Sequence, residues 1–269
     1  MGGHAVPSRS GERLYRIADS RRVWNGTCGA RGVNDGETGG GMSFTTFVYI
    51  VVTGSVAFLC YYALLLLPRQ IRRDYRQGLQ ALARAVEIRE NGTTGSAHWR
   101  ARYASEIARR LGLPARSVQD VEFAALLQEI GKVSIPYAIL NKQEPLTPEE
   151  EEVLKLHGVL SQRMLEQVPS LARLAPLIRH HHENWDGTGY PDGLQAEEIP
   201  LVSRILHIVD DYVDALRGKN MDDASLRLQA LEQLEAGKGT LYDPQLLEVF
   251  RAVVHAETSR QVNRSYHER

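Results

Sequence analysis

The sequence predicts an all-α protein in which one membrane-spanning helix precedes a helical domain. From about Leu79 onward, apolar residues recur at helical spacing. Strand signals are weak, because alternating β-branched runs are few and neither Asn-Gly pair, at 25–26 or 91–92, lies between two such runs as in a hairpin. Upstream, 24 consecutive residues from Phe44 to Leu67 carry no charge. A chain of 269 residues has room for one domain and an appendage.

The composition excludes some classes of function. The formal net charge is -1, so no global field favours binding to a nucleic acid polymer. The two cysteines, Cys28 and Cys60, are too few for a disulfide framework or a thiolate metal cluster. This cysteine usage fits a reducing compartment. Histidine is therefore the metal-ligand type to follow.

Residues 1–41 differ from the rest of the chain. They hold ten of the 23 glycines and six arginines but no lysine, and no apolar period lasts long enough for a helix or strand. Two interpretations are open: a disordered tail, or a mis-called start with Met42 as the true first residue. We favour the second, because a membrane segment follows Met42 almost directly.

We expect residues 42–68 to form a transmembrane helix, since about 20 apolar residues in a helix cross the hydrocarbon layer. The run ends in four leucines and Pro68 rather than in the small-residue cleavage site of a signal peptide. Four arginines follow at once, at positions 69, 72, 73 and 76. The positive-inside bias then places the C-terminal part in the cytoplasm.

The remaining segments are predicted from helical spacing and capping signals. Residues 69–90 are expected to form a juxtamembrane stalk, residues 91–258 the domain and residues 259–269 a tail. Within the stalk, a helical stripe is formed by Leu79, Leu82, Val86 and Ile88. A helix through Tyr103 and Ile107 ends at Gly112, and Thr147 begins a capping box that opens a helix through Gln167. Asp243 and Pro244 begin the last helix in the same way.

The densest polar cluster lies within residues 180–194, HHHENWDGTGYPDGL. Neutral imidazole is the commonest metal ligand, and successive positions on a helix diverge by about 100°. His181 and His182 can therefore reach one metal if the helix frays there. The glycines and proline that follow favour a compact loop able to approach a phosphate closely.

A second polar group lies in an apolar helix over residues 203–216. It carries Asp210, Asp211 and Asp214. Acids in so apolar a stretch need a partner if they are buried, and a metal ion is a good one. The alternative is that one or two of them face water.

Residues 181–191 read HHENWDGTGYP and match the HHE-x-x-DG-x-GYP signature of the HD-GYP proteins, which the chain resembles from about Leu79 to Val254. Further matches are the segments at 87–95, 130–140, 146–157 and 239–244. The resemblance implies an HD-superfamily helical bundle that holds two or three divalent metals and opens cyclic di-GMP. It also implies a bacterial protein, here single-pass in the inner (cytoplasmic) membrane.

The resemblance also implies roles for individual residues. It assigns metal ligands to His157, His181, His182 and Asp211, with Asp210 as the alternative to Asp211. Lys132 corresponds to a lysine that contacts the substrate phosphate, and Glu129 takes the place of the family's bridging aspartate. The substrate or partner loop comprises Asp186, Gly187, Gly189, Tyr190 and Pro191.

The chain departs from the family at the other ligands. The His-Asp pair falls on Gln128 and Glu129, and the first ligand histidine falls on Ser96, with His98 two places away. An amide oxygen is a poor ligand for a transition metal, so one metal site is expected rather than two, holding iron or manganese. Two-metal hydrolysis uses both ions to activate water and to stabilise developing charge.

Two functions follow as alternatives. The first is a degenerate domain that acts as a membrane-tethered receptor or scaffold, binding cyclic di-GMP or a related nucleotide, or a diguanylate cyclase (GGDEF) domain. The second is an active metal-dependent phosphodiesterase with a rearranged site. Homodimerisation through the stalk stays open, because no heptad repeat is sustained.

Overall fold

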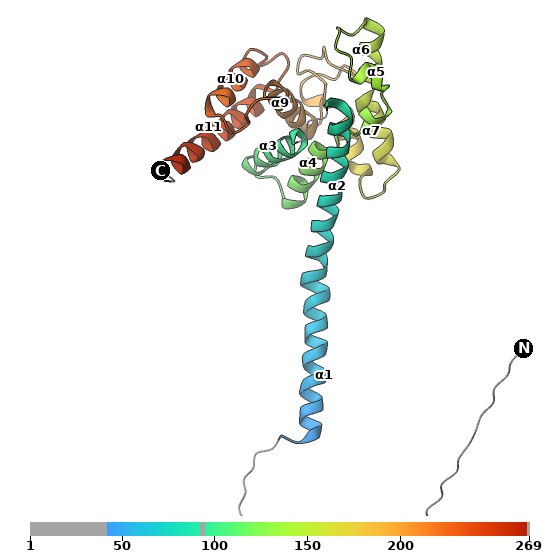
Figure 1. The fold of residues 1–269 in the computed structure, drawn as a ribbon, viewed down its shortest axis with the longest axis vertical. Coiled ribbons are helices and arrows are strands. Elements are labelled where there is room, and N and C mark those ends of the chain that lie inside the picture. Colours follow the sequence, from blue (N-terminus) through green and yellow to red (C-terminus); the bar gives the residue numbers. More distant parts are fainter. Residues whose placement is uncertain (1–41, 92–94, 268–269) are drawn as a thin grey trace, which may run out of the picture. The chain divides into compact units, whose positions relative to one another are not determined.

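The described part of the chain, residues 42–91 and 95–267 of the computed structural model, is helical and contains no strand (Figure 1). The all-α prediction is confirmed. Expectations for residues 1–41 lie outside the described residues. The helices are α1 (Phe44–Tyr61), the π-helix η1 (Tyr62–Leu66), α2 (Leu67–Asn91), α3 (Ser96–Arg110), α4 (Ala115–Leu127), the 3-10 helix η2 (Ile130–Ser134), α5 (Tyr137–Leu140), α6 (Pro148–Lys155), α7 (His157–Glu166), η3 (Ala172–Leu174), α8 (Ala175–Arg179), η4 (Ala196–Glu198), α9 (Leu201–Ala215), α10 (Ala224–Glu235) and α11 (Pro244–His267).

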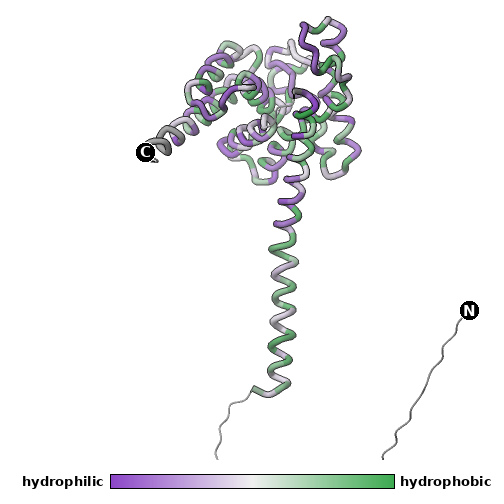
Figure 2. The backbone as a smooth tube through the Cα atoms, in the orientation of Figure 1, coloured by the Kyte–Doolittle hydropathy of each residue, from purple (hydrophilic) through white to green (hydrophobic). Residues whose placement is uncertain are grey.

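The N-terminal helical segment is long and apolar enough to cross a membrane. One continuous helix runs from Phe44 to Glu90, and none of its most apolar 18-residue window is buried. Figure 2 shows the apolar residues of α1 giving way to hydrophilic ones early in α2. The chain divides into two compact units, and the boundary lies between Val56 and Ala57, within α1. The second unit holds all the helices from η1 onward.

The last turns of α2 belong to the helical domain. Leu79, Ala83 and Val86 are buried, and the first two lie in the hydrophobic core. Leu82 and Ile88, predicted on the same stripe, are exposed. The contacts with α4 begin earlier, because Tyr75 packs on Phe123 and Arg76 pairs with Glu122. Only the part of the segment before Tyr75 is therefore a candidate stalk.

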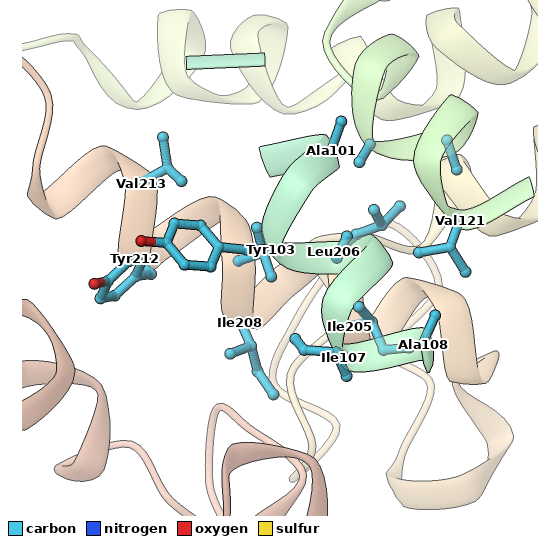
Figure 3. Close-up of a cluster of buried hydrophobic side chains, with 14 of the residues drawn as sticks. Ala101, Tyr103, Ile107, Ala108, Val121, Ile205, Leu206, Ile208, Tyr212 and Val213 are labelled. Carbon is cyan, nitrogen blue, oxygen red and sulfur yellow. The ribbon is translucent and has the colours of Figure 1, made fainter. Parts of the chain in front are cut away.

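The core lies between α3, α4, α9 and α11. Tyr103, Tyr212 and Phe250 meet edge to face at its centre, with ring centroids 4.9 to 5.7 Å apart. Figure 3 shows Tyr103 of α3 beside Tyr212 of α9, and Ile107 of α3 beside Ile205 of α9. Burial of this kind contributes about 1.5–3 kcal/mol for each large apolar side chain. The core thereby fixes α3 against α9, which carry polar residues of the site.

The predicted helix ends are confirmed at several positions. Helix α3 stops before Gly112, which has a φ of +72°, a conformation that favours glycine. The Thr147 hydroxyl accepts from the Glu150 N–H and the Glu150 carboxylate accepts from the Thr147 N–H, which completes the capping box of α6. At the other end of the chain, Asp243 accepts the N–H groups of the first turn of α11.

Two helix boundaries differ from the sequence prediction. The helix expected from Thr147 through Gln167 is interrupted at Leu156, giving α6 and α7. The cause is local, because the His157 imidazole Nδ1 lies 2.8 Å from the Leu154 carbonyl oxygen and takes the acceptor that a continuing helix would use. Helix α11 continues to His267, so most of the tail expected over 259–269 is helical.

A close backbone contact holds η2 against α7. A Cβ atom on Gly131 would lie 2.1 Å from the His157 carbonyl oxygen and 2.6 Å from the Ser161 nitrogen, so only glycine fits. The Gly131 N–H donates to the Ser161 hydroxyl, which donates in turn to the Gln128 carbonyl. This contact sets the positions of Glu129 and Lys132, on either side of Gly131.

We expect Gly131→Ala to lower the free energy of unfolding by more than about 2 kcal/mol, because the added methyl forces η2 and α7 apart. Gly78→Ala in α2 is the matched control, since a Cβ there meets nothing within 4 Å. It should raise stability by about 0.5–1 kcal/mol through helix propensity. Chemical unfolding of the full chain in detergent, followed by circular dichroism, measures both. Equal effects of the two substitutions would contradict the role given to Gly131.

Candidate metal centre

Three histidine side chains converge where α7 meets the end of α8. His157 begins α7, whereas His181 and His182 follow the C-cap of α8. The helix ends there, so His181 and His182 do not diverge as helical neighbours would, and their ring centroids lie 4.0 Å apart. The His157 Nε2 atom lies 3.3 Å from His181 Nε2 and 3.1 Å from His182 Nε2.

Backbone carbonyls fix which nitrogen of two of these rings carries the proton. His157 Nδ1 lies 2.8 Å from the Leu154 oxygen, and His181 Nδ1 lies 2.6 Å from the Ile178 oxygen. A carbonyl only accepts, so each Nδ1 is the donor and each Nε2 keeps a lone pair. Lone pairs that face each other repel unless a proton or a metal ion lies between them. Backbone contacts of this kind orient histidine ligands in metal sites.

His181 and His182 are held neutral, which is the form of imidazole that binds metals. Burial, and then the neighbouring His157, lowers the pKa of His181 to about 3. Burial and the adjacent His181 and His157 lower the pKa of His182 well below its usual value. Both rings therefore stay uncharged at neutral pH, and a divalent ion would meet no proton to displace.

Glu129 joins the three histidines. It follows α4, and one of its carboxylate oxygens belongs with the imidazole nitrogens to a group whose atoms all lie within 4.8 Å of one another. Burial alone would raise the pKa of Glu129, but Lys132 and His157 outweigh it and hold the pKa well below the usual range. The group therefore offers three imidazole nitrogens and one anionic oxygen.

This donor set fits a divalent transition metal. Nitrogen atoms bound about 2.1 Å from one ion lie about 3.0 Å apart at an octahedral edge and about 3.4 Å apart in a tetrahedron. The separations of His157 Nε2 from the other two Nε2 atoms, 3.1 and 3.3 Å, fall in that range. Imidazole with carboxylate suits iron, manganese or zinc. The convergent lone pairs thus agree with the metal dependence implied by the sequence.

The predicted aspartate ligand lies outside this group. Asp211 accepts a hydrogen bond from the Tyr242 hydroxyl at 2.6 Å, and its Oδ2 lies 3.4 Å from His207 Nε2. Asp210, the alternative, is buried but points to a different set of partners. Neither belongs to a four-ligand group among the described residues. The assignment of Asp211 as a ligand stays a prediction.

The partner of Asp210 is an arginine from α3. Arg100 Nε lies 2.5 Å from Asp210 Oδ1, and Arg100 Nη2 donates to Asp214 Oδ1 at 2.5 Å. The Gln128 amide donates to Asp210 Oδ1 at 2.7 Å. Burial raises the pKa of Asp210, and Arg100 is the largest opposing influence. The sequence indicated that Asp210 needs a partner, but it gave no local signal for Arg100, which is 110 positions away.

Lys132 is buried between two carboxylates. Its ammonium lies 2.8 Å from Glu129 and 3.0 Å from Glu90, the next-to-last residue of α2. Burial alone would lower the pKa of Lys132, but Glu129 and Glu90 raise it above the usual value. The lysine predicted to contact a substrate phosphate is therefore charged, and both of its partners come from the protein. Glu90 was not anticipated from the sequence.

Ser96 stands where the resemblance implies the first ligand histidine, and no group of candidate metal ligands includes it or its described neighbours. Ser96 begins α3, and His98 is exposed, with its ring 6.2 Å from that of Trp99. Glu87 lies nearby, but its carboxylate accepts the N–H groups of Gly95 and Ala97. His98 therefore does not replace the missing ligand among the described residues.

The loop after the histidines is organised around Glu183. Its two carboxylate oxygens accept the N–H groups of Asp192 and Leu194, at 2.8 and 3.1 Å. Gly189 is required where the loop folds back, because a Cβ there would lie 2.2 Å from the Asn184 nitrogen. This fold-back brings the Tyr190 ring onto His182, nearly parallel and 5.0 Å away.

Asp186 attaches the loop to the segment that precedes α11. The Asp186 N–H donates to the Thr240 carbonyl at 2.8 Å, and its carboxylate accepts from Thr188. Gly187 has a φ of +84°, and the peptide bond between Tyr190 and Pro191 is cis. The loop therefore presents Tyr190 over the metal-ligand group and keeps Asp186 at the surface.

A second group of candidate ligands, His180, Glu183 and Asp192, is already satisfied within the protein. Arg179 binds both oxygens of Asp192, at 2.6 and 2.7 Å, and His180 Nε2 lies 2.8 Å from Asp192 Oδ2. The guanidinium and the imidazole lower the pKa of Asp192 to about 2. These contacts hold the loop that follows the histidines. His180 pairs with Asp192, so it serves as a control for substitutions of His181 and His182.

Comparisons with known proteins agree with this architecture. A family model described as an HD domain matches residues 80–246. The cyclic di-GMP phosphodiesterase response regulator RpfG of Xanthomonas campestris is 35% identical over 186 residues, which cover 66% of this chain and 48% of the relative. A cyclic di-GMP phosphodiesterase of Thermotoga maritima is 36% identical over 149 residues, which cover 55% of this chain and 40% of the relative.

A solved structure shows the same fold. It is that of a cyclic GMP-AMP specific phosphodiesterase of Vibrio cholerae, with a TM-score of 0.54 and 19% identity. The match covers 70% of this chain and 53% of that one. The chain thus spans about half, or less, of the length of the relatives it matches.

We expect His181→Ala to reduce bound metal from about one equivalent per chain to near zero, because the metal-ligand group loses one of its three imidazoles. His180→Ala is the matched control: it removes the adjacent imidazole, which pairs with Asp192 instead. Elemental analysis of both variants, purified without oxygen and without chelators, measures the difference. Equal metal content in the two variants would contradict the assignment of the centre.

Proposed function

Since this chain belongs to the HD domain family, within its HD-GYP group, we propose that it is a membrane-anchored signalling receptor or scaffold with impaired or no catalysis. The ligand in this proposal is cyclic di-GMP or a related cyclic dinucleotide. The relatives that support this ligand class are named for cyclic di-GMP and for cyclic GMP-AMP. Diguanylate cyclase domains are proposed as protein partners of the loop that carries Tyr190.

One observation carries the proposal: the metal-ligand group is intact on one side only. His157, His181, His182 and Glu129 would hold one divalent ion, iron or manganese, which would polarise a phosphate oxygen when bound. On the other side, the positions implied for a second ion hold Gln128 and Ser96. The Gln128 side chain donates to Asp210, so its amide nitrogen faces that carboxylate. The amide oxygen that remains is a poor ligand for a transition metal.

The consequence for catalysis is large. Loss of one of two ions removes several kcal/mol of transition-state stabilisation, which corresponds to a rate about a thousandfold lower or more. Lys132 adds to the effect, because its ammonium is paired with Glu90 and Glu129. A phosphate would have to displace one of these carboxylates to reach it.

The proposed anchor is helix α1 with the basic residues that follow it. A single pass through the bacterial inner membrane is supported by the apolar run, none of which is buried. Arg69, Arg72 and Arg73 are exposed at the start of α2, which supports a cytoplasmic location for the helical domain.

A second candidate function is active hydrolysis by a rearranged site. It is favoured by the intact group of three histidines and Glu129, and by the retained Lys132. In this alternative Glu129 supplies the carboxylate of the missing aspartate with one more methylene. Activity would then require His181 and His182.

We expect the metal-loaded full chain to bind cyclic di-GMP but to hydrolyse it at least about a thousandfold more slowly than the Xanthomonas relative assayed in parallel. Chromatography of the nucleotide after incubation without oxygen measures the product, and metal content is determined on the same preparation. Turnover comparable to that of the relative, lost in His181→Ala but kept in His180→Ala, would instead establish the active alternative.

We expect the chain to sediment with membranes and to resist alkaline washing. Val52→Arg with Val56→Arg should release it or prevent its accumulation there, because each arginine near the helix centre costs about 2.5–3.5 kcal/mol on insertion. The matched control is Leu82→Arg with Ile88→Arg, also exposed apolar positions but in α2 beyond the apolar run. A chain found in the soluble fraction, or pairs with equal effects, would contradict the proposed anchor.

A further inference from the structure

A second polar group, buried except for Asp214, lies beside the metal-ligand group. It consists of Arg100 from α3, Gln128 at the end of α4, and Asp210 with Asp214 from α9. Gln128 of this group and Glu129 of the metal-ligand group are consecutive residues, so the two groups adjoin at this point of the backbone. Arg100, Gln128 and Asp210 are each no more than 3% exposed. No histidine belongs to this second group.

The arrangement follows from the cost of burying charge. An isolated ion inside a protein costs several kcal/mol or more, so a buried carboxylate needs a cation or hydrogen-bond donors. Asp210 and Asp214 lie one turn apart on α9 and both point to the Arg100 guanidinium. Asp214 is also paired with Arg217, at 2.7 Å. Asp210 has Arg100 as its nearest cation and the Gln128 amide as its hydrogen-bond donor.

Asp210 and Asp214, one turn apart on a helix, offer the kind of oxygen ligands that manganese and magnesium prefer. Burial raises the pKa of Asp210, and Glu129 is close enough for its charge to raise it as well. The Gln128 Oε1 atom is also buried and has no hydrogen-bond partner in the described part of the chain. Without Arg100, the carboxylate oxygens of Asp210 and Asp214 and the Gln128 amide oxygen would have no guanidinium between them to balance their negative charge. A divalent ion could then supply the charge that the guanidinium supplies now.

We propose that Arg100 is a built-in cation that takes the place of a divalent ion beside the histidine centre and so restricts this site to one metal. The inference rests on the proposed function for the histidine centre alone. The guanidinium places a positive charge where a second ion would bind. Arg100 and Gln128 also donate hydrogen bonds to the carboxylate oxygens that would be the ligands of that ion. The chain would therefore bind one ion. Arg100 is a positioning residue in this role.

Arg100→Gln tests the inference, because it removes the charge and keeps much of the side-chain volume. The matched control is Arg102→Gln on the same helix, where the side chain is 46% exposed and pairs with Glu257. Full-length chains purified in detergent are loaded with excess Mn²⁺, desalted and analysed for manganese. We expect one equivalent in the unsubstituted chain and in Arg102→Gln, and two in Arg100→Gln.

Electron paramagnetic resonance supplies a readout independent of activity. A single bound Mn²⁺ gives an isolated-ion spectrum, whereas two ions about 3.5–4 Å apart are exchange-coupled. We expect the coupled spectrum in Arg100→Gln alone. Two equivalents in the unsubstituted chain, or one uncoupled equivalent in Arg100→Gln, would overturn the inference. In the latter case the histidine centre of the proposed function would stand.

Further outcomes separate the two proposals. No manganese in the unsubstituted chain but one equivalent in Arg100→Gln would support the role of Arg100 and refute the histidine centre. No manganese in either would refute both. If Arg100→Gln is unfolded in chelator, added Mn²⁺ should restore its thermal transition, with a larger shift than in Arg102→Gln. A variant that stays unfolded with Mn²⁺ would show that an ion cannot replace the guanidinium, which overturns the inference.

Discussion

The ion pairs of Lys132 with Glu90 and Glu129 are the interaction on which the rest of the site depends. The ammonium of Lys132, in the short helix η2, pairs with Glu90 at the end of α2 and with Glu129, two residues after α4. Without it these two half-buried carboxylates would repel each other, and the pKa of Glu129 would lose the largest influence that lowers it. Because Gly131 fits only against the backbone of His157 and Ser161, the position of Lys132 is tied to that of α7 and its histidine.

What the sequence predicted correctly depends on local signals. The capping box at Thr147, the turn at Gly112 and the helix start after Asp243 are each decided by a few neighbouring residues. The approach of His181 and His182 likewise follows from a helix that ends just before them. The sequence could not give the break at Leu156, because it depends on where the His157 side chain turns.

Local signals in the sequence could not identify ion pairs between residues that are far apart in the chain. The apolar surroundings of Asp210 indicated that it needs a partner, and a metal was a reasonable expectation. The partner is Arg100, which the packing of α3 on α9 brings within 2.5 Å. On the same helix as Asp210, Asp211 accepts a hydrogen bond from Tyr242. A fold shared with phosphodiesterases therefore does not fix the chemistry, which depends on which charges occupy the site.

The end of α2 shows why the site cannot be separated from the segment that leads to it. Arg89 donates to the carbonyl oxygens of Lys132 and Ile135, at 2.6 and 2.8 Å, and Glu87 accepts the N–H groups that begin α3. Without Arg89 and Glu90, the carbonyls of Lys132 and Ile135 would lose their hydrogen bonds from Arg89, and Lys132 would lose one of its two carboxylates. A domain boundary after residue 90, as the sequence suggested, would cut through the site itself. The helical domain must therefore include the last turns of α2, in the same continuous helix as the apolar run.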